Sequence, residues 1–362
     1  MLETDNPDAF LALHELVRAA KTRLSRAHWD YLMGGSDTET TLRRNRQALD
    51  SIALRPRVLR DVHGVDCGGT LLGHRLRLPA ILAPIGSMQD FVEGGGMVPA
   101  RAAAEFGTIS TLSSACQPEL EAVATAAEGP KIYQLYVRGD AAWVDDHLRR
   151  AIDAGYTAFC FTVDLDYYAR RERDIAKRHV TTSRQYALGD AFQERFCWAD
   201  IARIRDRFDI PLILKGIATA EDAALAVEHG IAGIWVSNHG GRQLDHAQGG
   251  IDTLPDIVRA VAGRAQIIFD GGIMRGTDLV KAMALGADAV AIGRLQGLAA
   301  AAAGQAGIVR ALELLESETR IVLGLMGAAS FAGIEASQLC PATPTAPAHV
   351  LSAFPLLEEE GY

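Results

Sequence analysis

Residues 212–242 read LILKGIATAEDAALAVEHGIAGIWVSNHGGR. Two short apolar runs, residues 212–214 and 233–236, flank an alanine-rich stretch, residues 219–229, that has the composition of a helix. Each apolar run leads into a loop that contains glycine and polar residues. Apolar runs that alternate with helices are typical of parallel strands, which are buried on both faces. The stretch therefore predicts one β/α unit followed by the strand of the next.

The same pattern recurs along the chain after Pro79. Eight such units over roughly 220 residues predict an α/β fold, a closed (β/α)8 TIM barrel with an N-terminal helical extension. A doubly wound open sheet is the structural alternative, but no Gly-x-Gly-x-x-Gly motif follows the first run to support a dinucleotide site. The predicted strands are residues 80–83, 108–112, 132–137, 158–163, 212–214, 233–236, 266–269 and 289–292. The predicted helices between them are residues 98–106, 118–127, 141–154, 198–208, 219–229, 254–262 and 277–285.

The chain reads as a single domain, residues 1–362, in three parts. Residues 1–75 are predicted to form a helical cap, because apolar residues recur at helical spacing until Gly34-Gly35 stops the pattern. Residues 76–330 form the barrel. Residues 331–362 are expected to be a loose C-terminal arm, because prolines recur in it.

Composition narrows the class of protein. The net charge of −9 disfavours a nucleic-acid partner, because no basic stripe offsets it. Five scattered cysteines, without a Cys-x-x-Cys motif or a histidine cluster, indicate reduced thiols in the cytoplasm and no metal site. The N-terminus does not resemble a secretory signal, and no run of roughly 18 apolar residues predicts a membrane span.

The loop after the sixth predicted strand carries reactive side chains. His239 and Arg242 lie three residues apart with glycines between them, and the carboxylate of Asp245 follows. A histidine can take a proton, and a guanidinium can hold a carboxylate by its planar fork. The alternative is a loop histidine that only caps a turn. The loop predicts a site for proton abstraction from an anionic substrate.

The carboxyl ends of the strands form the working face of a TIM barrel. Gly271-Gly272 follows the seventh predicted strand and Gly293-Arg294 follows the eighth, and glycines there let backbone N–H groups approach a phosphate. Lys215 ends the fifth strand, where a buried ammonium needs an anion. Its alternative is a structural ion pair. Neutral hydrogen-bonding groups at other strand ends are Ser113, Gln134 and Thr162.

With these motifs the chain resembles the FMN-dependent 2-hydroxy acid oxidases and dehydrogenases, which include glycolate oxidase, lactate oxidase, mandelate dehydrogenase and the flavin domain of flavocytochrome b2. The resemblance runs from about Trp29 to about Ala329. Single motifs are weak, but together they are specific. They are residues 55–59, 134–136, 162–164, 214–216, 237–245, 270–272 and 292–294.

The resemblance assigns roles residue by residue. His239 would be the catalytic base, Asp164 would orient it, and Tyr136 would bind the substrate hydroxyl. The substrate would be held by Tyr31, Tyr136, Arg171 and Arg242. FMN would be bound by Pro84, Ile85, Gly86, Ser113, Gln134, Thr162, Lys215, Ser237, Asp270, Gly271, Gly272, Ile273, Met274, Arg275, Gly293 and Arg294.

The function implied is FMN-dependent oxidation of an (S)-2-hydroxy acid to the 2-oxo acid, with oxygen or another electron acceptor. The alternatives are oxidative decarboxylation or monooxygenation of a 2-hydroxy acid, another FMN barrel enzyme such as type 2 isopentenyl diphosphate isomerase, and a non-catalytic flavin-binding protein. We expect no nucleic-acid or membrane partner. By resemblance, we expect a homo-oligomer, a homotetramer.

Three departures from the family pattern carry expectations of their own. Met274 stands where the family usually has a phosphate-binding arginine, so either FMN binds more weakly or Arg275 compensates. Ala115 stands where glycolate oxidase has a tryptophan over the substrate, which favours a substrate larger than glycolate. The segment of residues 172–198 is short where the family usually has a long lid, so we expect an open site.

Overall fold

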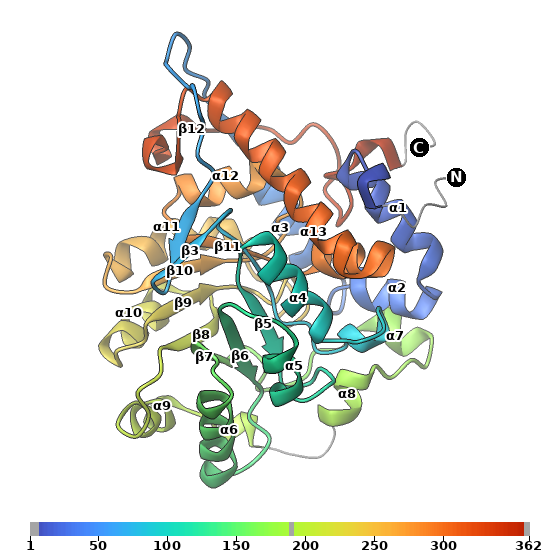
Figure 1. Cartoon of the computed structure of the whole chain (residues 1–362), viewed down its shortest axis with the longest axis vertical. Helices are drawn as coiled ribbons and strands as arrows, with labels where there is room; N and C mark the ends of the chain where they lie inside the picture. Colours follow the sequence, from blue (N-terminus) through green and yellow to red (C-terminus); the bar gives the residue numbers. More distant parts are fainter. Residues whose placement is uncertain (1–6, 188–191, 358–362) are drawn as a thin grey trace.

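The computed structural model describes residues 7–187 and 192–357. Eight parallel strands close into one barrel in the order β10-β11-β4-β5-β6-β7-β8-β9, which confirms the predicted TIM barrel (Figure 1). Each predicted strand forms at the expected place. The strands are β4 (Ala80–Leu82), β5 (Ser110–Ser113), β6 (Lys131–Leu135), β7 (Ala158–Thr162), β8 (Leu212–Ile217), β9 (Gly233–Val236), β10 (Gln266–Phe269) and β11 (Ala289–Ile292).

Helices cover the outside of the barrel, and the seven predicted between the strands all form. The alanine run at residues 298–303 belongs to an eighth, longer helix. The helices are α4 (Met97–Phe106), α5 (Leu120–Ala126), α6 (Ala141–Asp153), α9 (Trp198–Arg205), α10 (Ala220–Glu228), α11 (Gly250–Val261), α12 (Gly276–Ala284) and α13 (Arg294–Leu325).

Alternate strand residues fill two separate cores, because side chains alternate across a strand. In β7, Ala158 and Cys160 join the core inside the barrel, whereas Phe159 and Phe161 pack outward against helices. A hairpin that the sequence did not predict, β2 (Gly69–Leu71) and β3 (His74–Leu76), adds fully buried Leu71 and Leu76 to the inner core. The carboxyl ends of the strands are left for the functional site.

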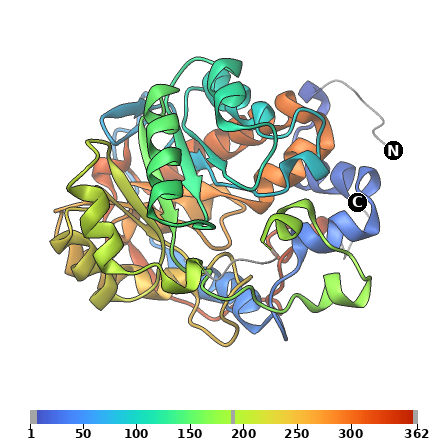
Figure 2. The same cartoon turned by 90° about the horizontal axis from the view of Figure 1, so that it is seen from below.

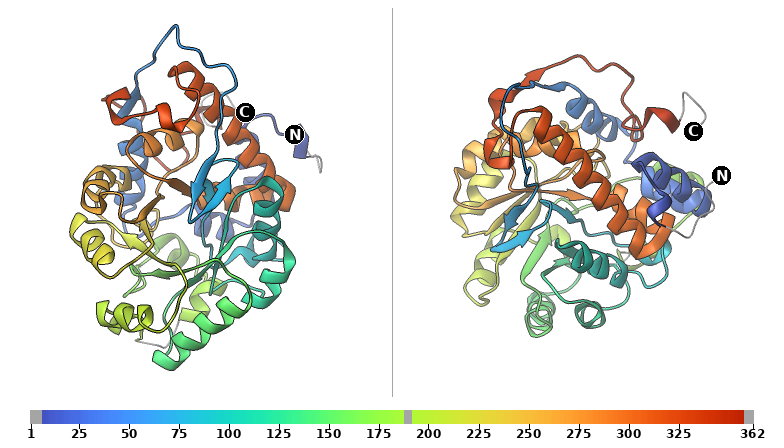
Figure 3. Two further views of the ribbon diagram at one scale, coloured as in Figure 1. Left: turned by 60° about the vertical axis from the view of Figure 1, so that its left-hand side comes forward. Right: turned by 45° about the horizontal axis from the view of Figure 1, so that its top comes forward.

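The predicted helical cap is wrong for residues 51–75, because strand pairing with the C-terminal arm and within the β2–β3 hairpin takes the place of helix there, and residues 1–6 lie outside the described residues. The part before residue 51 is helical, as predicted. It comprises η1 (Pro7–Ala9), α1 (Leu13–Arg23), α2 (Arg26–Met33) and α3 (Thr40–Asp50), followed by β1 (Ile52–Leu54). Helix α1 packs against α13 and α3 packs against α11 (Figure 3). Gly34 is the C-cap of α2, so the glycine pair ends this helix as expected. We call residues 7–50 the cap.

The expectation of a loose C-terminal arm is wrong for the described part of the arm. Strand β12 (Leu339–Pro341) pairs antiparallel with β1. Phe354 is 2% exposed, so burial and strand pairing outweigh the local effect of the prolines. The short helices η4 (Phe331–Gly333), η5 (Ala336–Gln338) and η6 (Pro355–Leu357) complete the arm. Residues 358–362 of the predicted arm lie outside the described residues.

Among the described residues, one helix, α13, is long and apolar enough to cross a membrane by length and composition. Its most apolar window is 56% buried inside the protein, and it packs against α1, α4 and α12. Its backbone leaves the helical conformation at Ala303 and Gly304. These contacts are those of a core helix, here the last of the barrel helices.

Candidate active site

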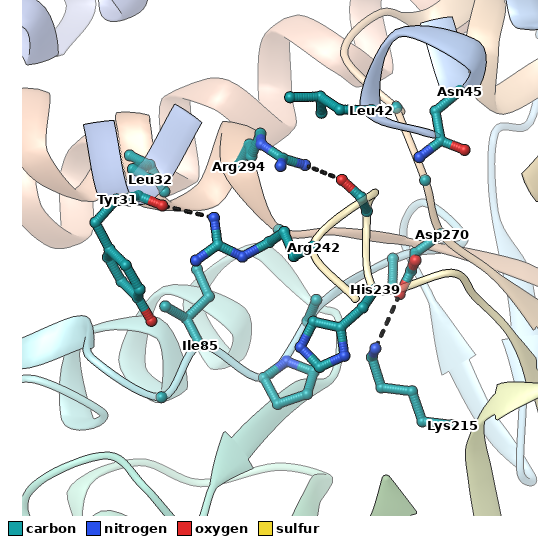
Figure 4. A pocket seen from close by; sticks show the side chains of 18 of the residues that line it. Tyr31, Leu32, Leu42, Asn45, Ile85, Lys215, His239, Arg242, Asp270 and Arg294 are labelled. Carbon is teal, nitrogen blue, oxygen red and sulfur yellow. Dashed lines mark hydrogen bonds and ion pairs between the residues drawn. The ribbon is translucent and has the colours of Figure 1, made fainter. Parts of the chain in front are cut away.

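A cavity opens at the carboxyl ends of the strands, between the barrel and the cap (Figure 4). Its empty space is about 1230 Å³, part of which is open to solvent. Most predicted site residues line it. They are Tyr31, Pro84, Ile85, Gly86, Tyr136, Arg171, Lys215, His239, Arg242, Asp270, Gly271, Gly272, Ile273, Met274, Gly293 and Arg294.

His239 and Asp164 form a hydrogen-bonded pair. Nδ1 of His239 lies 3.0 Å from Oδ1 of Asp164, and both side chains are largely buried. Because Nδ1 faces the carboxylate, Nε2 is the ring nitrogen left for a ligand. His239 has a φ of 57°, which is uncommon for a residue other than glycine, and its N–H donates to Ser237 Oγ. The loop thus holds the imidazole in one orientation.

The electrostatics of this pair suit a base. Burial lowers the pKa of His239 below its ordinary value, although Asp164 opposes the shift. Burial would raise the pKa of Asp164, but His239 and Lys215 hold it below its ordinary value. Gly216, with a φ of +111°, allows this placement because a Cβ there would lie 2.7 Å from the Asp164 side chain. His239 is therefore neutral, and Asp164 charged, near pH 7.

Lys215 belongs to a hydrogen-bonded floor beneath the cavity. Its Nζ donates to Ser237 Oγ at 3.1 Å and lies 3.6 Å from Asp270 Oδ2. Ser237 Oγ and Trp235 Nε1 each donate to the Asp270 carboxylate. Asp270 and Asp164 raise the pKa of Lys215 despite its burial. The structural ion pair considered for Lys215 is present, and the ammonium still reaches the cavity.

Three of the arginines that line the cavity were predicted site residues: Arg171, Arg242 and Arg294. None forms an ion pair with a carboxylate within the described ranges. Arg242 and Arg294 both donate to the carbonyl of Gly34, and Arg294 also donates to the carbonyl of Gly240. Burial, together with Arg242, lowers the pKa of Arg294 to about 9. Partly desolvated cations that lie close together, with no described carboxylate in ion-pair contact, make a strong site for anions.

Glycines line the cavity where β10 and β11 end, and β10 is the neighbour of β9, which leads into the His239 loop. Gly271 and Gly272 have φ values of +117° and +99°, and Gly293 follows β11. Met274, buried, lies beside them. The structure does not bring Arg275 to the cavity, because its guanidinium pairs with Glu318 and donates to the carbonyl of Ala353. It therefore offers no replacement for the family's arginine.

Five further predicted residues are not among those that line the cavity. Asp164 supports His239, and Ser237 belongs to the floor. Ser113 lines a small neighbouring cavity that shares Ile85 with the main one. Both amide atoms of Gln134 and the hydroxyl of Thr162 are buried without a hydrogen-bond partner. Because buried polar groups are normally paired, these atoms are candidates to bind a polar ligand.

Sequence reasoning missed several lining residues: Leu42, Asn45, Phe91, Arg138, Leu165, Tyr168 and Val350. Asn45 of α3 exchanges two hydrogen bonds with Asn238, the residue before His239. The motif at residues 237–245 contains Asn238, but nothing in it pointed to α3. Asp245 does not face the cavity. Its carboxylate accepts hydrogen bonds from the N–H groups of Thr38 and Thr41 and caps α3.

The segment after β7 lies beside the cap, where α7 contacts α2 (Figure 2). It contains α7 (Glu172–Ala176), α8 (Thr182–Ala187) and η3 (Gln193–Arg195). Arg173 forms ion pairs with Asp30 and Glu39 of the cap, and Lys177 pairs with Asp30. These ion pairs join the segment to the cap, but part of the cavity remains open to solvent, so the open site stays a prediction. Residues 188–191 of the segment lie outside the described ranges.

Ala115 is buried and does not line the cavity, although the sequence placed it beside the substrate. Its N–H donates to Ser113 Oγ. The cavity's aromatic walls instead come from Tyr31 and Phe91, whose ring centroids lie 5.9 Å apart, and from Tyr168. These rings, and not Ala115, therefore bound the space for a substrate side chain.

Comparison with known proteins places this geometry in a family. Residues 20–341 match the model of the FMN-dependent dehydrogenase family. The chain is 40% identical to a peroxisomal (S)-2-hydroxy-acid oxidase of Oryza sativa subsp. japonica, covering 90% of this chain and 95% of the relative. It is 38% identical to an L-lactate oxidase of Nostoc sp., covering 90% and 97%.

The solved structures give the same result. A mandelate oxidase in complex with benzoyl-formic acid is 39% identical and aligns with a TM-score of 0.86. The alignment covers 93% of this chain and 100% of that structure. Sequence and structural similarity thus agree over nearly the whole chain.

Proposed function

The chain belongs to the FMN-dependent dehydrogenase family and is an FMN-dependent oxidoreductase that acts on the CH–OH group of 2-hydroxy acids, and we propose that His239 is its base and that its substrate is larger than glycolate. One observation carries the proposal. A largely buried His239–Asp164 pair shares a cavity with three arginines that lack carboxylate partners among the described residues.

The residues present fit FMN. The orphaned polar atoms of Gln134 and Thr162 suit the edge of a flat polar ring, and Lys215 offers a cation beside them. Gly271, Gly272 and Gly293, which we call the glycine cradle, together with Arg294 suit the phosphate at the other end of FMN. Pro84, Ile85 and Gly86 supply an apolar wall. FMN, when bound, supplies the acceptor for the two electrons that leave the substrate.

The substrate carboxylate would lie between Arg171 and Arg242, whose charge it neutralises. This places the hydroxyl-bearing carbon near His239, whose Nε2 takes up the proton that the substrate releases. Asp164 stabilises the imidazolium that forms and keeps the ring oriented. Burial raises the pKa of Tyr136 to about 12, so its hydroxyl stays protonated and can donate to a substrate oxygen.

The proposed substrate size rests on the walls at the carboxylate end of the cavity. Tyr31, Phe91, Leu165 and Tyr168 line it, and the first two rings stack on each other. Aromatic rings and an apolar side chain favour a substrate whose own side chain is apolar and flat. Glycolate has no side chain with which to use these contacts.

The proposal includes a cytoplasmic location and a homotetramer. Its support is that all five cysteines are free thiols, as is common in a reducing compartment, and that the sequence resembles enzymes that assemble. Light scattering coupled to size-exclusion chromatography gives the mass of the assembly. Cell fractionation of the source organism tests the location, and recovery with an organelle fraction would contradict it.

The test of the function is anaerobic. Protein loaded with FMN is mixed with (S)-2-hydroxy acids that range from glycolate to aryl acids, and flavin absorbance is followed. We expect bleaching, with larger acids effective at lower concentration than glycolate. Bound FMN that no acid bleaches contradicts the reaction, and preferential bleaching by glycolate contradicts the size. Admitting air reveals whether oxygen accepts the electrons, and product analysis separates the 2-oxo acid from a decarboxylated product.

A further inference from the structure

Tyr168 lies where the substrate end of the cavity meets the segment after β7. It lines the cavity and is partly buried. The guanidinium carbon of Arg171 lies 4.5 Å from the centroid of its ring. The guanidinium carbon of Arg184, from α8, lies 4.7 Å from the same centroid. The ring of Tyr168 therefore contacts one arginine that lines the cavity and one arginine of α8.

The way Arg171 is held differs from the way buried arginines are usually held. It is 5% exposed, its Nε has no hydrogen-bond partner, and it makes no ion pair with a described carboxylate. Its guanidinium lies against the faces of Tyr168 and, at 5.8 Å, Tyr31. A ring face attracts a guanidinium without neutralising its charge. The cation is thus fixed in place yet remains available to an anion.

Arg46 provides the contrast within the same molecule. It also lines the cavity, but its guanidinium is bound by Asp50 and Asp278 at 2.7 Å each. Two carboxylates satisfy its charge, so it has little left to offer a ligand. The rings around Arg171 therefore indicate an arginine that binds a ligand. The carboxylates around Arg46 indicate an arginine with a structural role.

We infer that Tyr168 is a positioning residue: its ring orients Arg171 for the substrate carboxylate, and Arg184 ties α8 to this stack. The inference rests on the proposed function, in which Arg171 binds that carboxylate. It assigns the effect to the ring face and not to the hydroxyl of Tyr168, because the cations stack on the ring.

The adjacent tyrosine gives a matched control, because Tyr167 is 74% exposed and does not line the cavity. Tyr168→Leu, Tyr168→Phe, Arg184→Met and Tyr167→Leu are prepared as FMN-loaded proteins. Each is titrated with benzoate, which carries a carboxylate and cannot be oxidised, and with benzamide, which is similar in shape but uncharged. The dissociation constants are read from the perturbation of the flavin spectrum.

We expect Tyr168→Leu to weaken benzoate binding about tenfold, which corresponds to about 1.4 kcal/mol, and benzamide binding less than twofold. Tyr168→Phe and Tyr167→Leu should match the wild type. Arg184→Met, which keeps the ring, should weaken benzoate about twofold to threefold. For the best substrate, Tyr168→Leu should raise KM with little change in kcat.

Equal benzoate affinity in Tyr168→Leu and Tyr167→Leu would overturn the inference. So would equal losses for benzoate and benzamide, or a Tyr168→Phe variant as weak as Tyr168→Leu. If Tyr168→Leu does not retain FMN, the other two variants test the inference. Benzoate affinity unchanged in Arg184→Met, or lowered about tenfold in Tyr168→Phe, would overturn it. A wild-type protein that neither binds benzoate nor is bleached by any 2-hydroxy acid would instead contradict the proposed function.

Discussion

The two ends of the cavity are built differently. The floor comes from adjacent barrel strands, whose register places Thr162 beside Lys215 and Lys215 beside Trp235. The substrate end comes from the cap, the His239 loop and the segment after β7, which are joined by side chains. There Arg173 pairs with Glu39, and Arg171 stacks on Tyr168.

The two ends of the cavity should therefore respond differently to single substitutions. Backbone hydrogen bonds of the barrel fix the floor, so a single side-chain change leaves its geometry intact. The substrate end depends on contacts between segments far apart in sequence, so single changes there should alter ligand binding strongly. Each prediction below tests this division, beginning with the largest effect.

Among the changes to groups that hold the substrate, Arg242→Met should cause the largest loss. The guanidinium carbon of Arg242 lies 4.7 Å from the centroid of the Tyr31 ring. Its charge has no ion-pair partner among the described residues and is proposed to bind the substrate carboxylate. Loss of a charge-assisted hydrogen bond to a carboxylate costs about 3 kcal/mol, or about 100-fold in kcat/KM. Steady-state kinetics measure this loss, and fluorescence titration measures FMN affinity. A comparable loss of FMN affinity would mean that the two ends are not separate.

Acid should abolish turnover by protonating His239. Because burial places its pKa below the ordinary value of 6.5, kcat/KM should be flat above that pH and fall about tenfold per unit well below the pKa. Asp164 raises the pKa of His239, so Asp164→Asn should move the acidic fall to lower pH while reducing the plateau. A fall centred above pH 7 would contradict the assignment of the base.

Met274→Arg should strengthen the phosphate site at the floor. Met274 lines the cavity beside the glycine cradle, and Arg275 is held by Glu318. An added cation should tighten FMN binding about fivefold, less than an ideal charged bond gives because the site is buried. Titration of the apoprotein measures the affinity, with riboflavin, which has no phosphate, as the control ligand. Equal gains for both flavins, or no gain for FMN, would contradict the prediction.

Asp245→Ala should affect stability and not chemistry. The carboxylate accepts from the N–H groups of Thr38 and Thr41 and caps α3 from a distant loop. Loss of a helix cap costs about 1 kcal/mol of unfolding free energy. Denaturant unfolding of the FMN-loaded protein measures the cost, and kcat/KM per bound FMN should change less than twofold. A much larger kinetic change would give Asp245 a direct part in the site.

The alternation of apolar runs and helices in the sequence predicted the barrel and most of the floor. Short apolar runs separated by helices identify strand ends, and the register of a closed barrel brings those ends together. Gln134, Thr162, Lys215 and Asp270 could therefore be placed from spacing and family resemblance. Arg275 could not, because its direction depends on Glu318 of α13, 43 residues away in sequence.

The substrate end was predicted only in part. Tyr31, Arg171 and Arg242 were assigned by resemblance, and the cavity brings them together. Tyr168 and Asn45 were missed, since their roles arise from contacts with α8 and with Asn238 that no local pattern encodes. The ion pairs of the segment after β7 with Asp30 and Glu39 were also missed, because they join distant parts of the chain.

We propose that His239 is the base of an FMN-dependent oxidation and that the other parts of the site are positioned independently of it. Stopped-flow reduction of FMN-loaded His239→Gln by the best 2-hydroxy acid, without oxygen, tests this most directly. We predict that the variant binds FMN and benzoate within about threefold of the wild type but is reduced at least about 1000-fold more slowly. Reduction within tenfold of the wild-type rate would contradict the claim.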